Sequence, residues 1–296
     1  HDDDAVPDLG DLGIDAIKKR AGELKTFLND VDLEAEFVAP RLWMDPRTID
    51  GGFTSNSAEE REYAVWRALR SIDIARALGS DRIVLWLARE GTLCAESKEQ
   101  GQAMQHIVSA LNEMLAYDRG IRILIEPKPN EPIDRSFCPT IGHALALGTA
   151  TQSPERLGVL VESAHATLAG LDPANEMAFA LSMGKLWSVH LNDQNGLKYD
   201  QDKVFGAENL RQAFNQVRTL VDHNYGANGE YIGLDVKAMR TQPAEDCYRH
   251  IENSLRLIRA MKRKVDSLDR KKIEALRSKR NYEQIELYIL EHLLGA

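Results

Sequence analysis

The sequence has little cysteine, no long apolar run and a shortage of positive charge, and each shortage excludes a class of protein. Three cysteines in 296 residues are odd in number and lack zinc-type spacing. We therefore expect no disulfide framework, and we place the protein in a reducing cytoplasm. Since no apolar run reaches bilayer-spanning length, we expect no contact with a membrane. A net charge of -9 disfavours nucleic acid as a partner.

Short apolar runs alternate with amphipathic helical stretches along most of the chain, and 43% of the residues are hydrophobic, enough for one large core. This alternation predicts a parallel sheet, either open and doubly wound or closed as a (β/α)8 barrel. We expect strands near residues 34–42, 82–88, 121–127, 156–162, 186–192 and 230–236. We expect helices near 10–29, 57–79, 97–118, 140–150, 175–184, 207–224 and 244–265. The barrel domain would span 1–265, and a charged C-terminal helical arm would follow over 266–296.

One predicted strand ends in Glu126 and Lys128, and this segment is the most informative in the chain. Residues two apart in a strand share a face, so a carboxylate and a cation lie side by side. In a closed barrel, inward-facing side chains meet at the C-terminal mouth, where barrel enzymes carry their chemistry. An open sheet would spread the same groups along an edge, so we favour the TIM barrel. Polar groups also end the next predicted strands: Glu162 and His165, His190 and Asn192, Asp235 and Lys237.

Seven strings, in order along the chain, resemble the xylose isomerase family. The resemblance implies an α/β TIM barrel of the xylose isomerase-like type, with a cis peptide bond between Glu131 and Pro132. It also implies a cytoplasmic homo-oligomer, a dimer or tetramer, that interconverts D-xylose and D-xylulose by ring opening and a 1,2-hydride shift. The strings begin at His1, Asp50, Trp86, Glu126, Glu162, Lys198 and Glu291, and the last reads Glu-His-Leu-Leu-Gly-Ala.

The resemblance further implies two divalent metal ions per subunit. Hard oxygen ligands with one or two imidazoles suit Mg²⁺ first, and Mn²⁺ or Co²⁺ as alternatives. Five carboxylates crowded together would repel one another, so two divalent ions are the natural counter-charge. The first metal would be held by Glu126, Glu162, His190 and Asp235, and the second by Glu162, His165, Asp200 and Asp202.

The same resemblance implies roles in ring opening and substrate binding for other matched positions. His1, oriented by Asp4, would open the sugar ring as an acid and base, because imidazole titrates near neutral pH. Lys128 would polarise the carbonyl end of the open-chain sugar. The implied substrate-binding set is Trp43, Trp86, Glu126, Lys128 and Asn192.

The chain departs from the family pattern in two places. His190 stands where the family has an aspartate, and related metal-dependent isomerases and epimerases use histidine there. An isomerase or epimerase acting on another sugar is therefore the alternative function. The family's catalytic histidine follows the second barrel strand, yet here it is residue 1, so roughly 40 residues would precede it. We therefore expect a barrel that is incomplete at its N-terminus, and a noncatalytic fragment that binds sugar or metal remains a further alternative.

Overall fold

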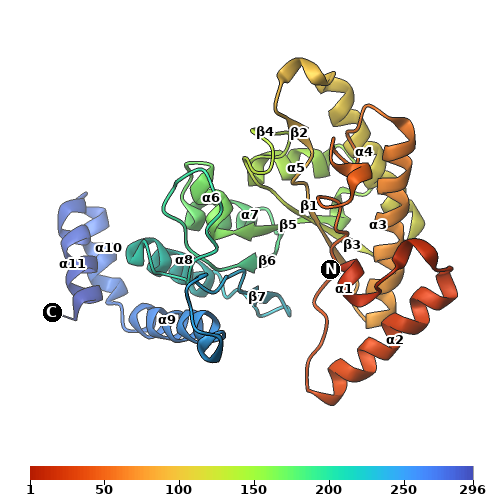
Figure 1. The fold of residues 1–296 in the computed structure, drawn as a ribbon. Coiled ribbons are helices and arrows are strands. Elements are labelled where there is room, and N and C mark those ends of the chain that lie inside the picture. Colours follow the sequence, from red (N-terminus) through yellow and green to blue (C-terminus); the bar gives the residue numbers. More distant parts are fainter. Residues whose placement is uncertain (296) are drawn as a thin grey trace.

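The structure is a computed structural model that describes residues 1–295. Its centre is a five-stranded parallel sheet with strands in the order β1-β3-β5-β6-β7. Helices cover the outer face of this curved sheet (Figure 1), and the resulting half-barrel confirms the predicted α/β barrel class. The strands are β1 Arg82–Trp86, β3 Arg122–Glu126, β5 Leu157–Glu162, β6 Leu186–His190 and β7 Tyr231–Gly233, and a small antiparallel sheet pairs β2 Gly91–Thr92 with β4 Arg135–Ser136.

The helices follow the amphipathic stretches closely, with three differences. The last predicted barrel helix begins at Arg249 rather than near 244, and two short helices, one at residues 2–5 and one directly after β5, were not predicted. Ser57 begins α3 by accepting a hydrogen bond from the Glu60 amide, and Gly79 ends α3 in the left-handed conformation that favours glycine. The helices are α1 Asp2–Ala5, α2 Ile14–Asp30, α3 Ala58–Leu78, α4 Gln100–Tyr117, α5 Ile141–Thr149, α6 Ser163–Leu168, α7 Pro173–Ser182, α8 Leu210–Asp222, α9 Arg249–Asp266, α10 Arg270–Ser278 and α11 Tyr282–Leu294.

The C-terminal helices α10 and α11 lie at the far end of the molecule from α2 and α3 (Figure 1). Two ion pairs link them to α8: Arg270 contacts Asp222 at 2.6 Å, and Glu286 contacts Arg211 at 2.6 Å. Within the described residues, no helix combines the length and the apolar character that crossing a membrane requires.

The prediction of a strand over residues 34–42 is wrong. Only Val38 pairs with the sheet, in an isolated parallel bridge to Ile83 at the outer edge of β1. Side chains of the same segment contact β6 and β7, at the other end of the sheet. The Glu36 carboxylate accepts a hydrogen bond from Ser188 of β6 at 2.7 Å, and Glu34 accepts one from Tyr231 of β7. The segment therefore joins β1, β6 and β7 across the open side of the sheet.

The two faces of the sheet pack against different partners, as the strand parity predicts. Outward-facing residues such as Ile83, Leu85 and Ile123 join the large core beneath the helices. The inward-facing residues form a small separate cluster, flanked by Phe37 and Trp187. Since alternate residues share a face, the same inward rows continue into the polar groups at the strand ends. The members of the inner cluster are Ala39, Val84, Leu124 and Leu160.

Candidate metal centre

A cavity of about 390 Å³ lies at the C-terminal ends of the strands. Its apolar side is formed by Phe37, Ala39, Trp43, Val84 and Trp86. Most of the polar residues singled out in the sequence line the same cavity: His1, Glu126, Lys128, Glu162, His165, His190, Asp200, Asp202, Asp235 and Lys237.

Four potential ligands from different strands form the first cluster. Ligand atoms of Glu126, Glu162, His190 and Asp235 all lie within 4.8 Å of one another. Their approach follows from the sheet register, in which Glu162 of β5 is the direct partner of His190 of β6. Because paired residues of parallel strands present their side chains to one face, the imidazole and the carboxylate meet there.

A second cluster shares Glu162 with the first and adds His165 and Asp200. His165 returns to the side of Glu162 because α6 begins directly after β5, so the two residues are three apart at a helix start. The His165 Nε2 atom lies 3.0 Å from Asp200 Oδ2 and 3.3 Å from Glu162 Oε1. Lys128 Nζ contacts the same Asp200 oxygen at 2.9 Å.

Asp202 was expected with this second cluster, but its carboxylate points elsewhere. It accepts a hydrogen bond from Lys237 Nζ, and the Lys237 amide donates to the Asp202 carbonyl at 2.8 Å. Asn192 Nδ2 lies 3.3 Å from the other carboxylate oxygen. The structure therefore brings Asp202 into the cavity without joining it to Glu162, His165 and Asp200.

Asn192 was expected to bind substrate, and the structure places it beneath the carboxylates instead. Its side chain is buried and does not line the cavity. Its Nδ2 donates to Glu162 Oε1 and to the Asp235 carbonyl, both at 2.9 Å. Its Oδ1 accepts from the Ala164 amide at 2.8 Å. Since both ends of the amide are engaged by protein, the geometry gives Asn192 a positioning role rather than a substrate contact.

The carboxylates of the two clusters have pKa values displaced in opposite directions. Burial, reinforced by the negative charge of Glu162, raises the pKa of Glu126 well above its ordinary value and raises that of Asp235 as well. Burial also opposes ionisation of Glu162, but the facing His165 holds its pKa down at about 2. Burial together with Asp200 and Glu162 raises the pKa of Asp202 to about 7. This pattern is typical of a site with more negative charge than the nearby lysines neutralise.

The residues fit divalent metal ions by a second criterion, which is the state of their buried polar atoms. Buried polar atoms are normally hydrogen-bonded, and exceptions indicate a missing partner such as an ion. In residues 1–295, four atoms of the two clusters are buried without such a partner: Glu162 Oε2, His165 Nδ1, His190 Nδ1 and Asp200 Oδ1. All four belong to the hard oxygen or imidazole donors that Mg²⁺, Mn²⁺ and Co²⁺ accept.

An aromatic surface faces these clusters. Trp43 and Trp86 meet edge to face with ring centroids 4.5 Å apart. The Trp86 ring is nearly parallel to that of His165, and Lys128 Nζ lies 5.0 Å from the Trp86 centroid. The rings of His1 and Trp43 are also arranged edge to face, with centroids 5.0 Å apart. Together these rings form an apolar surface suited to the C–H face of a sugar.

His1 and Asp4 are in contact, with Nδ1 of the imidazole 3.0 Å from Asp4 Oδ2. The peptide bond between Glu131 and Pro132 is cis, which confirms that expectation. The sequence interpretation gave no role to Phe37, which faces the His190 ring at 6.0 Å. It also gave none to Lys237, although strand parity already placed this lysine beside Asp235.

The sequence matches one family model and several curated relatives. A family model described as xylose isomerase-like TIM barrel matches residues 3–250. The curated relatives include the xylose isomerases of Thermus thermophilus and Thermus caldophilus. Each is 34% identical over 272 residues, which cover 90% of this chain and 69% of the relative.

Solved structures with a similar fold include two epimerase-type proteins. A D-tagatose 3-epimerase-like protein aligns with a TM-score of 0.65 and 18% identity, covering 83% of this chain and 85% of its own. The 3-keto-D-glucoside 4-epimerase of E. coli aligns with a TM-score of 0.62 and 14% identity, covering 82% and 85%. At these identities the likeness shows a shared fold alone.

Proposed function

The chain belongs to the xylose isomerase-like TIM barrel family, and on that premise we propose that it is a metal-dependent sugar isomerase that interconverts D-xylose and D-xylulose. The observation that carries this proposal is the pair of potential metal clusters that share Glu162 at the base of the cavity. Lys128 lies beside them, and Trp43 and Trp86 line the same cavity.

The ligand sets for the two metals follow from the clusters. Glu126, Glu162, His190 and Asp235 would hold the first metal, and Glu162, His165 and Asp200 the second. Asp202, which contacts Lys237, is the remaining candidate for the second set. When bound, such ions supply Lewis-acid polarisation of the sugar oxygens.

Lys128 has the properties needed to bind the oxygen of an open-chain carbonyl. Burial alone would discharge it, but Asp200 and Glu131 raise its pKa and keep the ammonium charged. An ammonium held in a water-poor cavity donates a strong hydrogen bond to an oxygen that gains negative charge. In this proposal Trp86 and Trp43 orient the sugar and exclude water, and His1 moves the proton that opens the ring.

A related function is favoured by one observation, the presence of His190 in the first cluster. Compared with a carboxylate, a neutral imidazole leaves this cluster with one fewer negative charge. A sugar epimerase or an isomerase for another sugar, working by proton abstraction from carbon, is therefore the second candidate. The two candidates differ in what happens to the migrating hydrogen, because a hydride shift does not exchange it with solvent.

The experiment that tests the proposal is conversion of D-xylose in D₂O by protein loaded with Mg²⁺, Mn²⁺ or Co²⁺. We expect D-xylulose with almost no deuterium at C1 or C2. Substantial deuterium would identify the proton-transfer candidate instead. Absence of conversion for a panel of aldoses and ketoses, with two metals bound, would contradict both candidates and favour a noncatalytic sugar-binding role. A His223→Ala variant, in which only the exposed end of α8 is changed, serves as a control and should give the same result as the unchanged protein.

A further inference from the structure

One side of the cavity is formed by His1, Ala39 and Trp43, which line it without belonging to a strand. We refer to these three residues as the loop wall. A strand residue such as Trp86 is held in place by the hydrogen bonds of the sheet, through its register with β3. The loop wall lies outside this ladder, so its position depends on other contacts.

Asp2 joins the first two residues of the loop wall. Its backbone amide donates to the Ala39 carbonyl at 3.0 Å, and its carboxylate oxygen Oδ1 accepts from the Arg41 amide at 3.0 Å. These two hydrogen bonds lie on either side of Pro40. Since His1 directly precedes Asp2, they fix the position of His1 relative to Ala39.

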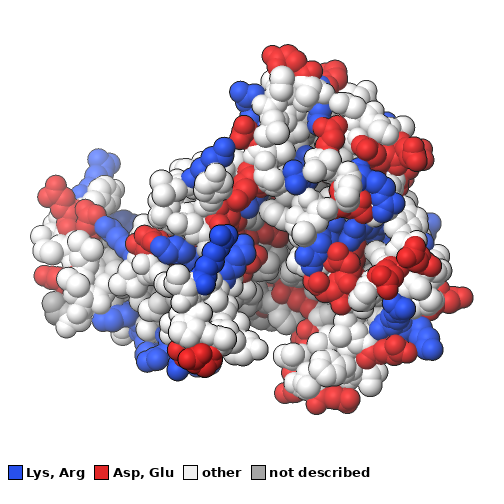
Figure 2. Space-filling model, viewed as in Figure 1, with Lys and Arg blue, Asp and Glu red and all other residues white. Residues whose placement is uncertain are grey.

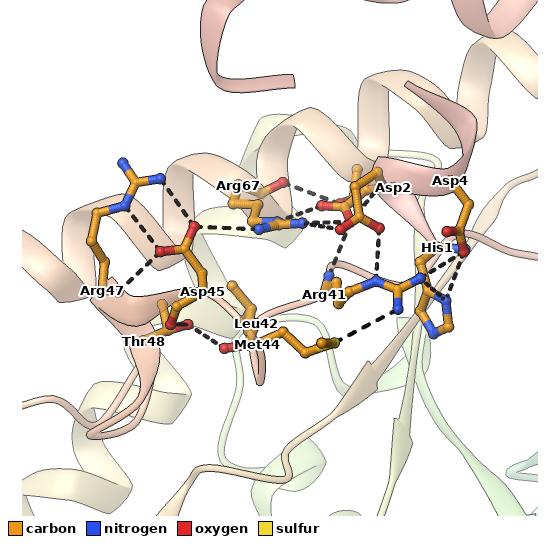
Figure 3. A network of polar contacts seen from close by, with 12 residues as sticks. His1, Asp2, Asp4, Arg41, Leu42, Met44, Asp45, Arg47, Thr48 and Arg67 are labelled. Carbon is orange, nitrogen blue, oxygen red and sulfur yellow. Dashed lines mark hydrogen bonds and ion pairs between the residues drawn. The ribbon is translucent and has the colours of Figure 1, made fainter. Parts of the chain in front are cut away.

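The Asp2 carboxylate is fully buried and is held by Arg67, a buried residue of α3 (Figure 3). Arg67 Nε donates to Oδ2 at 2.7 Å, and Nη2 donates to Oδ1 at 3.0 Å and to Asp3 Oδ2 at 3.2 Å. Basic and acidic side chains also lie next to one another on the surface around the N-terminus (Figure 1 and Figure 2). Surface pairs are screened by water, whereas a buried bidentate pair strongly favours one arrangement.

The third nitrogen of Arg67 faces the loop that carries Trp43. Arg67 Nη1 lies 3.6 Å from Asp45 Oδ2, and Tyr63 of the same helix donates to that oxygen at 2.7 Å. The other Asp45 oxygen accepts from the Arg47 amide at 2.9 Å, where a short 3₁₀ helix begins. The turn that follows Trp43 is therefore tied to α3.

The backbone on both sides of the Trp43 side chain is also held. The Thr48 hydroxyl donates to the Leu42 carbonyl, and Arg89 Nε donates to the Trp43 carbonyl at 3.1 Å. The indole itself meets Trp86 of β1 edge to face. Because the loop is closed on itself in this way, a shift of its anchor on α3 should move Trp43 with it.

We propose that Arg67 is a positioning residue that holds the loop wall against α3 and so sets the shape of the cavity. Its three side-chain nitrogens contact Asp2, Asp3 and Asp45 in one plane, and a lysine ammonium cannot reach all of these acceptors at once. The consequence for substrate rests on the proposed function. The loop wall would contact the sugar equally in the ground state and the transition state, so it should affect KM more than kcat.

Arg67→Lys tests the proposal by the exposure of Trp43 to acrylamide, a fluorescence quencher. The signal of Trp43 is the difference between each protein and the same protein carrying Trp43→Phe. We expect its quenching constant to rise about twofold, because a loosened loop opens more often to solvent. The matched control is Arg70→Lys, since Arg70 is buried on the same helix but pairs with Asp73 at 3.0 Å. It should leave the quenching of Trp43 unchanged.

Two outcomes would overturn the proposal: unchanged quenching of Trp43 in a folded Arg67→Lys protein, or an equal rise in Arg70→Lys. If Arg67→Lys does not fold, Asp45→Ala removes the link to the Trp43 loop and keeps the Asp2–Arg67 pair. Its control is Tyr63→Phe, which removes the other donor to the same oxygen. A larger rise in Asp45→Ala than in Tyr63→Phe supports Arg67, whereas equal rises would assign the anchor to Tyr63.

Metal binding and kinetics separate this proposal from the proposed function. Titration calorimetry should show both metals bound by Arg67→Lys as in the unchanged protein, because the loop wall supplies no ligand to the clusters. With D-xylose as substrate, KM should rise about three- to tenfold while kcat changes less. An unchanged KM beside increased quenching would sink the contact between loop wall and sugar. If the protein converts no sugar, the proposed function fails, while the quenching result still decides the role of Arg67.

Discussion

His190 Nδ1 lies 3.9 Å from Glu162 Oε2, and neither atom has a hydrogen-bond partner within residues 1–295. The two residues are register partners on neighbouring parallel strands, so this approach is imposed by the sheet. Asp235 Oδ2 is also 3.9 Å from the same nitrogen. The separation is too long for a hydrogen bond and suits two ligands of one cation. This relationship places a nitrogen donor in the first cluster.

Replacing His190 tests that donor. We expect His190→Ala to weaken the first metal by about tenfold or more while the second cluster keeps its metal. His190→Asp should shift preference toward Mg²⁺ over Mn²⁺ and Co²⁺, because it restores a hard oxygen ligand. Titration calorimetry with each ion measures both effects. Unchanged stoichiometry and affinity in His190→Ala would remove the histidine from the site.

Removal of metal should destabilise the protein. An ion that binds only the folded state adds about 2.7 kcal/mol at a hundredfold excess over Kd. We expect added Mg²⁺ or Mn²⁺ to raise the melting temperature by several degrees, and EDTA to reverse the change. A melting curve that responds to neither treatment contradicts the metal centre. Monovalent salt at matched ionic strength is the control for general screening.

The pH dependence of the metal-free protein should reveal Asp202. Its pKa in the folded state is raised to about 7 by burial and by Asp200 and Glu162, so the folded state binds this proton more tightly than the unfolded chain. The contribution of this proton to the free energy of unfolding is complete below about pH 4, and it is lost as pH rises through about 7. Urea unfolding in EDTA should show this decline between pH 5 and 7.5. Asp202→Asn should reduce it, and an identical slope in that variant would assign the decline elsewhere.

Lys128→Met should separate substrate chemistry from metal binding. Loss of the buried ammonium should lower kcat by roughly 10² to 10³. Metal binding at the second cluster should be retained or strengthened, because Asp200 is released from its 2.9 Å contact with Lys128. Lys198→Met is the matched control, since Lys198 is exposed and, within residues 1–295, its ammonium pairs only with Asp134. Equal losses of activity in the two variants would deny Lys128 a specific role.

Gly158→Ala tests the packing inside the half-barrel. An added Cβ at Gly158 would overlap ring atoms of Trp187, which flanks the inner cluster. We expect a loss of about 1 to 3 kcal/mol in the free energy of unfolding. Gly142→Ala, in α5, meets only Thr140 Oγ1 at 3.7 Å and should be neutral or slightly stabilising. Equal stability of both variants would contradict the close packing of Trp187.

The sequence alone determined the features that depend on strand parity. Alternation placed Ile123 and Ile125 toward the helices and Leu124 toward the inner cluster, as the structure has them. The same rule placed Glu126, Glu162 and His190 on one side at the strand ends. Parity works because each side chain's direction is set by its own backbone, without reference to distant residues.

The tertiary structure alone decided which distant groups meet. Carboxylates of segment 34–42 accept hydrogen bonds from β6 and β7, and the pattern of the segment itself does not reveal these contacts. Asp202 contacts Lys237 instead of joining the second cluster, and Asn192 lies beneath the carboxylates. Arg41 reaches His1 across 40 positions of sequence. In each case several polar groups of similar chemistry compete for one partner, and only the folded path of the chain determines which lies within hydrogen-bonding distance.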